Sequence, residues 1–526
     1  MLAMDERSAK DSLTFDTPFI PLLHSRRSEP KYGSIWPAGE SVMPAKTGAQ
    51  YVSRLSERPC EVWLRGERIE DVTTHPALRN GVRSVADLYD MQLDSKLRDE
   101  MTYSSPTSGE PVGLCFQTPR TIEDLERRRA MMTRWAWSSC GMMARTPDFL
   151  NVAITAWAAG AEFFAQNRPE FKKNVEDYYE FVRENDITLT HTLVNLQKSR
   201  IPGMADNLDE QVALTVMKET DAGIIVKGSR MLATLGPITD EIAVYPTRSH
   251  LLGEESWRQA FSFAIPCDTP GVKFMCRESL DQGRSHFDHP LGSRFEEMDA
   301  VVFFDDVLVP WERVFLLGDV DMCNNHGNAT QMNAHTGHQV TTRCVVKAEF
   351  ILGLAGLMVE TLGSDQLAHV QERMGELVVY LEILKACVRA SEADAQLNEW
   401  GMMCPAQTPL VAGRNLFPRM MYPRMAEIIQ ILGSSSLMAL PSEADFDTTL
   451  TPEVERYLAT DSSSAKDRTR LFHLAWDVAC SSFGGRQVLY ERFFGGDPVR
   501  NSIALSDNYD RGPAMERVQD FLNRAD

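Results

Sequence analysis

The sequence predicts an α+β protein in which a region of strands lies between two helical regions. Between residues 222 and 312, short apolar runs rich in Val, Ile and Phe alternate with Gly, Pro and Asp, a pattern typical of strands and turns. Before and after this region, apolar residues recur at three- and four-residue spacings, which indicate helices. A chain of 526 residues is also long enough for two or three domains.

The predicted domain boundaries follow from this alternation. Residues 1–45 are polar and rich in Pro, Ser and Gly, so we expect an N-terminal arm there. Residues 46–190 form the predicted N-terminal helical domain, residues 191–322 the central β domain, and residues 323–526 the C-terminal helical domain.

Individual elements can be located within these regions. Thr121 has the form of an N-cap followed by acidic residues, so a helix is expected to begin there. The periodicity predicts helices at residues 47–55, 85–93, 121–137, 149–166 and 171–184. The predicted strands lie at residues 222–228, 241–245, 260–265, 272–276 and 299–312. Four long helices, which suggest an antiparallel bundle, are predicted at residues 339–362, 366–396, 417–432 and 468–483.

Composition excludes several classes of function. A formal net charge of -20 argues against nucleic acid and against a polybasic membrane contact, because both need a basic surface. The sequence has no run of about 18 apolar residues and no signal peptide, so we expect a cytoplasmic protein without a membrane span. The ten cysteines are scattered, and such cysteines are most often reduced and buried.

Several common site types are missing from the sequence. It contains no phosphate-binding P-loop, no G-x-G-x-x-G nucleotide motif and no G-x-S-x-G nucleophile elbow. His335 and His338 lack the E-x-x-H context of a di-iron site, so we interpret them as helix-surface or cap histidines and predict no metal. Asp305 and Asp306 lie between two apolar runs, where a turn is expected rather than a pair of catalytic carboxylates.

Four segments are hard to explain by core packing alone, namely residues 140–150, 190–200, 228–234 and 481–486. Six landmarks also run in order along the chain: DVTTHP at 71–76, GMMARTPD at 141–148, ETDAGIIV at 219–226, HPLGSR at 289–294, VLVPWE at 307–312 and FGGRQVLYE at 483–491. In these segments the sequence resembles the 4-hydroxyphenylacetate 3-monooxygenase family, the oxygenase components of two-component flavin-dependent phenol hydroxylases. The resemblance spans about residues 46–500 and leaves out only the arm.

The resemblance implies an acyl-CoA-dehydrogenase-like fold with a helical domain, a β-barrel-like domain and a four-helix bundle, usually as a homotetramer. It implies FAD bound between domains and subunits and supplied as FADH2 by a separate NAD(P)H-dependent reductase, with O2 as co-substrate. A flavin C4a-hydroperoxide then transfers oxygen to the carbon ortho to the hydroxyl of a para-substituted phenol. The protein must exclude water, hold the ring and stabilise developing phenolate charge.

The same resemblance assigns the phenol-binding residues. Arg145 and His191 are expected to contact the phenol oxygen, since a permanent cation favours phenolate and an imidazole can exchange the proton. Without the resemblance, a helix-end salt bridge for Arg145 and a core histidine would be the ordinary interpretations. The family has a tyrosine where this chain has Phe149, which removes one hydroxyl from the substrate pocket. Thr247 and Arg248 match a substrate-lining loop.

For the flavin, the resemblance indicates His191, Gln197, Lys198, Ser199, Arg200, Thr234, Ser482, Phe483, Gly484, Gly485 and Arg486. Thr234 is expected near the reacting edge of the flavin, although a strand-end hydroxyl with a local partner is the ordinary alternative. Gly484 and Gly485 allow close backbone approach to a ligand, but a helix C-cap would use them equally well.

Three alternatives remain open at this point. The substrate is either a free 4-hydroxyphenyl acid or a tyrosine-like group tethered to a carrier protein, as in some natural-product pathways. A second possibility is an acyl-CoA dehydratase or dehydrogenase of the same fold, although no two cysteines are spaced four apart for an iron–sulfur cluster. A third is a non-enzymatic scaffold, which the retention of Arg145, His191 and Thr234 opposes.

Overall fold

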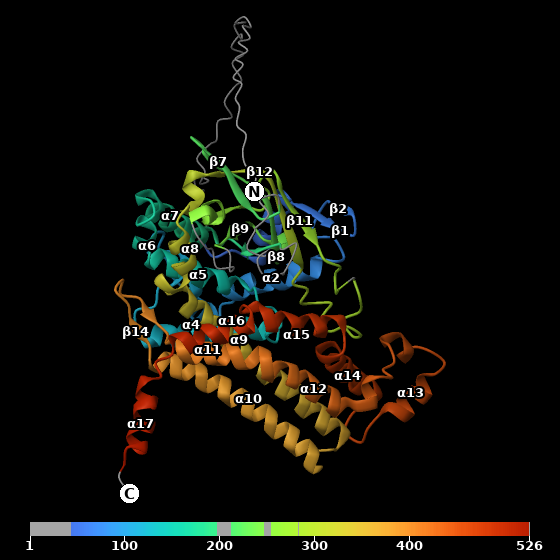
Figure 1. The fold of residues 1–526 in the computed structure, drawn as a ribbon. Helices are drawn as coiled ribbons and strands as arrows, with labels where there is room; N and C mark the ends of the chain where they lie inside the picture. Colours follow the sequence, from blue (N-terminus) through green and yellow to red (C-terminus); the bar gives the residue numbers. More distant parts are fainter. Residues whose placement is uncertain (1–43, 197–211, 247–253, 282, 525–526) are drawn as a thin grey trace, which may run out of the picture. The chain divides into compact units, whose positions relative to one another are not determined.

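The computed structural model describes residues 44–196, 212–246, 254–281 and 283–524, so nearly all of the predicted arm lies outside the described residues. Two sheets lie at the centre of the strand-bearing region (Figure 1). The larger sheet has the order β2-β1-β11-β12-β8-β6, with β7 also paired to β8, and the smaller has the order β13-β10-β9-β5. Their strands are β1 (Glu61–Leu64), β2 (Glu67–Ile69), β5 (Leu189–Thr192), β6 (Val194–Asn195), β7 (Thr215–Thr220), β8 (Gly223–Thr234), β9 (Glu241–Val244), β10 (Phe261–Pro266), β11 (Val272–Cys276), β12 (Asp299–Pro310) and β13 (Val314–Leu317). Two short hairpins, β3 (Thr102–Ser104) with β4 (Pro111–Gly113) and β14 (Gln396–Leu397) with β15 (Met403–Cys404), lie apart from these sheets.

The predicted strand region is confirmed, with one correction. Asp305 and Asp306 do not form a turn, because β12 runs through both and pairs with β8 on either side of them. The pairing register shifts between Phe304 and Val307, and Asp306 has a left-handed φ of 50°, which is the signature of a β-bulge. A bulge uses the same residue types as a turn while the strand continues. For this reason Asp305 and Asp306 predicted a turn where the structure has a bulged strand.

Helices α1 to α7 form most of the region before β5. Two of the five predicted helices in this region begin at a capping box: Thr47 and Thr121 each accept a hydrogen bond from the third residue of the helix, whose side chain bonds back. The helices are α1 (Gly48–Glu57), α2 (Arg79–Leu93), α3 (Arg98–Met101), α4 (Ile122–Ser138), α5 (Pro147–Ala159), α6 (Glu162–Ala165) and α7 (Pro169–Asn185). The region also contains strands, and β1 pairs in parallel with β11 of the larger sheet.

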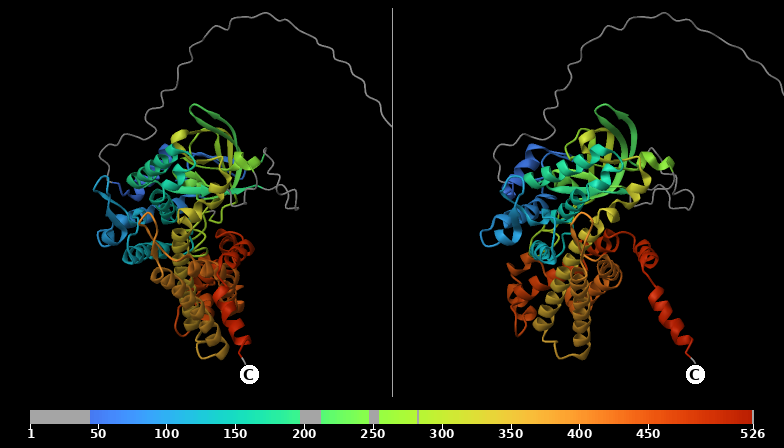
Figure 2. Two further views of the ribbon diagram at one scale, coloured as in Figure 1. Left: turned by 60° about the vertical axis from the view of Figure 1, so that its left-hand side comes forward. Right: turned by 90° about the vertical axis from the view of Figure 1, so that its left-hand side faces the viewer.

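A bundle of four long helices follows the strands, as predicted, and Figures 1 and 2 show it on one side of the strand-bearing region. Its members are α9 (Met332–Leu362), α10 (Ala368–Ala393), α12 (Tyr422–Gly433) and α14 (Ala465–Ala479). Helix α11 (Gln407–Leu416) enters α12 through a π-helical segment, Phe417–Met421. The remaining helices are α8 (Val320–Ala329), α13 (Thr451–Leu458), α15 (Ser482–Phe494), α16 (Pro498–Asn508) and α17 (Gly512–Leu522). The boundaries of the three predicted domains stay predictions.

Helix α9 is the packing centre, because it contacts α4, α5, α10, α11, α12 and α14. This burial corrects the interpretation of His335 and His338 as surface or cap residues, since both are completely buried in α9. His335 Nδ1 lies 2.6 Å from a nitrogen of Arg128, and His338 Nε2 lies 2.8 Å from a carboxylate oxygen of Glu392. Residues 334–344 of α9 are all buried, and a helix segment enclosed in this way buries polar positions that a two-sided helix would expose.

The ten cysteines are all free, as predicted, but only six of them are buried and four are half-buried. Among the helices that the structure describes, none combines the length and apolarity needed to cross a membrane. Helix α5 is nearly all buried and packs against α9, which places its first turn, and the residues just before it, deep in the protein.

Candidate active site

The predicted site begins at the turn that joins α4 to α5 and carries Arg145. Gly141 in this turn has a φ of +71°, and a Cβ there would lie 2.9 Å from the backbone nitrogen of Lys347. Only glycine tolerates both the positive φ and this approach. Arg343 of α9 donates to the carbonyl of Gly141 at 2.9 Å. The turn therefore rests directly on α9.

Glu297 holds the other end of the turn. One of its carboxylate oxygens accepts hydrogen bonds from the backbone nitrogens of Ala144 (2.6 Å) and Arg145 (2.8 Å). Its second oxygen accepts from Nη1 of Arg486 at 3.0 Å. Because Glu297 is only 1% exposed, these are buried, charge-assisted bonds of the stronger kind.

The Arg145 guanidinium lies against aromatic rings rather than carboxylates. Its Cζ lies 4.2 Å from the ring centroid of Phe149 and 4.2 Å from that of Phe494. Its Nε and Nη1 are buried and hydrogen-bond to none of the described residues. No described carboxylate pairs with the guanidinium, so the alternative of a helix-end salt bridge does not hold. Burial lowers the pKa of Arg145, yet an arginine remains a cation at neutral pH.

His191 and Phe149 lie next to one another in this site. His191 is in β5 and is 7% exposed, and its ring centroid lies 5.7 Å from that of Phe149. The ring of Tyr245, the residue after β9, has its centroid 5.7 Å from that of His191. The Tyr245 hydroxyl is buried without a hydrogen-bond partner among the described residues. Burial raises the pKa of Tyr245 despite the nearby charge of Arg145, so this phenol stays neutral.

Thr234 and Arg486, both predicted to bind the cofactor, meet at Asp299. The Thr234 hydroxyl donates to Oδ1 of Asp299 at 2.8 Å, across the β8–β12 pair and not locally. Arg486 donates through Nη2 and Nε to the two oxygens of Asp299, at 2.8 and 3.0 Å. Burial alone would raise the pKa of Asp299, but Arg486 and Arg277 lower it to about 2.

The predicted segment from Ser482 to Arg486 is the first turn of α15, capped by the hydroxyl of Ser481. The alternative that Gly484 and Gly485 form a helix C-cap is therefore wrong. A Cβ on Gly484 would meet the carbonyl of Val478 at 2.4 Å, whereas nothing lies within 4 Å of a Cβ on Gly485. Gly484 thus serves packing, and Gly485 faces open space.

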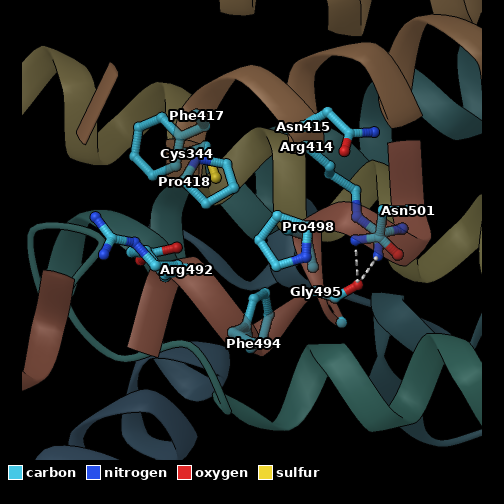
Figure 3. Close-up of a pocket in the computed structure, with 13 residues that line it drawn as sticks. Cys344, Arg414, Asn415, Phe417, Pro418, Arg492, Phe494, Gly495, Pro498 and Asn501 are labelled. Carbon is cyan, nitrogen blue, oxygen red and sulfur yellow. Dashed lines mark hydrogen bonds between the residues drawn. The ribbon is translucent and has the colours of Figure 1, made fainter. Parts of the chain in front are cut away.

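The α15 helix presents one face to the site. Arg486, Tyr490 and Phe494 are spaced four residues apart, so they stack along that face. The Arg486 guanidinium lies 4.1 Å from the Tyr490 ring, whose centroid lies 5.1 Å from that of Phe494. Phe494 also lines a hollow bordered by α9, α11 and α16 (Figure 3).

The structure brings together part of the predicted set and leaves part untested. Arg145, Phe149 and His191 adjoin one another, and Thr234 and Arg486 connect to them through Asp299 and Glu297. Six predicted residues lie outside the described part of the chain: Gln197, Lys198, Ser199, Arg200, Thr247 and Arg248.

The sequence did not predict five further residues of the site: Tyr245, Glu297, Asp299, Tyr490 and Phe494. Of these, Tyr245 and Tyr490 carried a signal, because Tyr245 lies just before the loop of Thr247 and Arg248 and Tyr490 lies in the landmark at 483–491. Within the described residues, no three His, Cys, Asp or Glu side chains gather as metal ligands.

Comparison with known proteins decides the family. The model of the 4-hydroxyphenylacetate 3-hydroxylase N terminal region matches residues 47–316, and that of its C terminal region matches residues 323–523. The chain belongs to the 4-hydroxyphenylacetate 3-hydroxylase family. It is 46% identical, over 91% of its length and 98% of the relative, to the 4-hydroxyphenylacetate 3-monooxygenase oxygenase component of Thermus thermophilus. A crystal structure of such a component, complexed with FAD and 4-hydroxyphenylacetate, superposes with a TM-score of 0.87 at 46% identity, over 91% of this chain and 98% of that one. The chain is thus a flavin-dependent monooxygenase.

Two more distant similarities bear on the alternatives. A Streptomyces globisporus monooxygenase whose name gives a 3-chloro-4-hydroxyphenyl group on a peptidyl-carrier protein is 31% identical over 90% of this chain and 89% of that protein. An archaeal 4-hydroxybutyryl-CoA dehydratase superposes with a TM-score of 0.82 over 92% of this chain and 96% of that one. At 18% identity, the dehydratase shares the fold alone. The acyl-CoA-dehydrogenase-like fold class predicted from the sequence is confirmed.

Proposed function

We propose that this chain hydroxylates a free 4-hydroxyphenyl carboxylic acid, 4-hydroxyphenylacetate or a close analogue, ortho to its hydroxyl. The observation that carries the proposal is the buried Arg145 cation, with two unbonded nitrogens in an aromatic corner. A buried donor without a partner costs free energy, so such a group in a native site indicates a ligand. A phenol oxygen that becomes anionic during reaction is the ligand that suits a permanent cation.

The residues around Arg145 strengthen its action on the phenol. Phe149 and Phe494 exclude water from the guanidinium, and in a low-dielectric site a cation stabilises developing phenolate more strongly. His191 lies next to Phe149 and takes or returns the phenolic proton. In this proposal Glu297 keeps the Arg145 turn in place during the reaction.

The described residues fit a bound flavin. Both polar side-chain atoms of Asn195, just before the segment of Gln197 to Arg200, are buried without a hydrogen-bond partner among the described residues. Gly485 has open space at the N-terminus of α15, and four of the five N–H groups of Arg486 are used by Asp299 and Glu297, which leaves one for a ligand. Reduced FAD, when bound here, would supply the electrons that activate O2, one atom of which would go to the phenol while the other leaves as water. Thr234 and the first turn of α15, Ser482 to Arg486, are the described part of the proposed cofactor site.

The proposal also specifies that the substrate is a free acid and not a group bound to a carrier protein. The Thermus relative named for 4-hydroxyphenylacetate is 46% identical, whereas the relative named for a carrier-bound substrate is 31% identical, which favours a free acid. Phe149 in place of the family tyrosine removes one hydrogen bond to the substrate, and Thr247 and Arg248 are proposed to line the acidic end.

We further propose a cytoplasmic homotetramer that receives reduced FAD from a separate NAD(P)H-dependent reductase. An oxygenase component, as the relatives are named, needs such a reductase. Large apolar side chains exposed on α10 and α17 support association between copies: Val378, Val379, Ile383, Met515, Val518 and Phe521.

The decisive experiment measures product with reduced FAD, O2 and a panel of phenols, both free and carrier-bound. We expect ortho-hydroxylation of the free acids, and turnover of only the carrier-bound phenols would contradict the proposed substrate. Arg145→Ala and His191→Ala are expected to abolish most product while reduced flavin is still oxidised, with hydrogen peroxide released instead. Arg68→Ala, an exposed position on β2, is the control. Unchanged product yield in both site variants would refute the assigned roles.

A further inference from the structure

Tyr490 brings a hydroxyl to the aromatic residues around the Arg145 guanidinium. Within the described residues, the Cζ of Arg145 lies 4.2 Å from the ring centroids of Phe149 and Phe494 and 5.9 Å from that of Tyr490. The side chains of Phe149 and Phe494 are purely apolar. Of these three neighbours, Tyr490 is therefore the one that can form a hydrogen bond beside the cation.

Neighbouring residues of α15 fix the position of the Tyr490 ring. The Cζ of Arg486, one turn earlier, lies 4.1 Å from its centroid, and the ring of Phe494, one turn later, lies at 5.1 Å. Arg486 is itself held by hydrogen bonds to Asp299 and Glu297. Tyr490 is only 8% exposed, so its hydroxyl is presented from a well-packed helix face.

The Tyr490 hydroxyl is buried without a hydrogen-bond partner among the described residues. Such a group costs free energy in the native state unless a ligand satisfies it. Burial raises the pKa of Tyr490, and Arg145 is the charge that lowers it most, so the group is a neutral donor close to the guanidinium. Tyr245 also has a buried hydroxyl without such a partner, but its ring packs against Trp157 and His191.

We propose that Tyr490 is a further substrate-binding residue, whose hydroxyl donates a hydrogen bond to the phenol oxygen beside Arg145. This inference rests on the proposed function, because it takes the phenol oxygen to bind at Arg145. The oxygen then accepts from Tyr490 as well as from Arg145, while His191 exchanges its proton. A hydrogen bond to an anionic oxygen is stronger than one to a neutral oxygen, so the Tyr490 bond strengthens as phenolate charge develops.

The test compares two ligands that differ only in the hydroxyl, 4-hydroxyphenylacetate and phenylacetate. Their Kd values are measured by calorimetry on the full-length protein with saturating FAD, and the ratio of the two values isolates the contacts to the phenol oxygen. Tyr490→Phe removes one donor, so the preference for 4-hydroxyphenylacetate is expected to fall about fivefold, the loss expected for one hydrogen bond. The Kd for phenylacetate should not change.

Tyr422→Phe is the matched control. Tyr422 is also completely buried, with a hydroxyl that lacks a partner among the described residues, but its ring lies 4.3 Å from Nζ of Lys347. Its preference is expected to equal that of the wild type. Both variants lose only an unpartnered hydroxyl, so both should fold, which thermal unfolding checks. Should Tyr490→Phe not fold, Tyr490→Leu makes the same comparison, because lost ring packing affects both ligands equally and cancels in the ratio.

The outcomes separate this inference from the proposed function. If the wild type binds both ligands equally well, the phenol oxygen does not bind at Arg145 and the proposed function fails. If the wild type prefers 4-hydroxyphenylacetate and Tyr490→Phe keeps the full preference, the assignment of Tyr490 alone is overturned. The assignment is also overturned if Tyr490→Phe keeps the preference but weakens FAD binding measured without a phenol, since the hydroxyl then serves the cofactor beside Arg486.

Discussion

A carboxylate oxygen of Glu297 lies 2.8 Å from the backbone nitrogen of Arg145 and accepts its hydrogen bond, although 152 residues separate the two. The same oxygen accepts from Ala144, and the other oxygen meets Arg486. One side chain thus joins the turn that carries the cation to the helix that carries Phe494. The orientation of Arg145 depends on this connection.

We expect Glu297→Ala to lower the rate of hydroxylation by roughly 10- to 100-fold, the effect of a displacement of about 1 Å in a site. Oxidation of reduced flavin should continue, so hydrogen peroxide rises as product falls. Glu297→Gln keeps an acceptor for the two backbone N–H groups but turns an amide donor toward Arg486, and its loss should be intermediate. Glu312→Ala, at an exposed position, is the control. Wild-type product yield from Glu297→Ala would show that the turn holds without this side chain.

Phe149→Tyr tests the missing hydroxyl in the substrate pocket. The added group can hydrogen-bond the substrate, and one such bond contributes about 1 kcal/mol, which corresponds to about fivefold lower KM for 4-hydroxyphenylacetate. Phe493→Tyr, which adds the same hydroxyl on the exposed neighbour of Phe494, should leave KM unchanged. If KM rises in Phe149→Tyr, the pocket has no acceptor or donor at this position.

Periodicity and capping were sufficient to predict the succession of a helical, a strand-bearing and a second helical region, but not the strands β1 to β4 within the first region. Thr47 and Thr121 cap their helices through contacts only three residues long, and such local bonds can be inferred from local sequence. The resemblance to a family placed Arg145, Phe149 and His191 in one site, and the structure shows their side chains close together.

The features that could not be predicted depend on distant contacts. Glu297 reaches Arg145 across the fold, and Phe494 reaches it from near the end of the chain. His335 is buried because α9 is enclosed by other helices, which its own sequence does not reveal. Asp306 lies in a bulge, whose residues resemble those of a turn while the strand continues.

Glu491→Gln tests a buried group of charges between α9 and α15. Glu491 accepts from Arg343 at 2.6 and 2.8 Å and from Lys347 at 2.7 Å, and all three side chains are at most 2% exposed. Neutralising the carboxylate leaves two buried cations without a counter-charge, which costs about 3–5 kcal/mol in the free energy of unfolding. Urea denaturation measures this loss.

The control for this variant is Glu427→Gln, because the Glu427 side chain is 56% exposed and its pair with Arg424 should contribute less than about 1 kcal/mol. Replacing Arg343, Lys347 and Glu491 together by apolar residues should cost less than Glu491→Gln alone, since no buried charge is then left unpaired. A triple variant less stable than the single one would contradict this account.

Asp148, three residues after Arg145, should make stability depend on pH. Burial raises its pKa from the ordinary 3.8 to about 6. Between these values the folded protein keeps a proton that the unfolded chain has released, so stability falls as pH rises through this window, by about 3 kcal/mol in total. The free energies of unfolding at pH 4 and pH 7 report most of this difference, and Asp148→Asn should reduce the pH dependence without abolishing it, because burial also raises the pKa of Asp186 and Asp281 to about 6. Asp321→Asn, an exposed control, should keep the wild-type difference. An equal pH dependence in Asp148→Asn and the wild type would exclude this residue as the source.

The bond between Asp299 and Arg486 has a consequence for synthesis of the protein. Arg486 lies 187 residues after Asp299, so a growing chain contains Arg145, His191, Thr234 and the first cation beside Asp299, Arg277, long before the second cation, Arg486, leaves the ribosome. Until then the buried acids Glu297 and Asp299 lack this partner and oppose closure of the pocket. A chain that stops short of α15 therefore lacks the helix that meets Asp299 and Glu297 through Arg486. We expect prematurely terminated copies to be unable to hydroxylate the phenol.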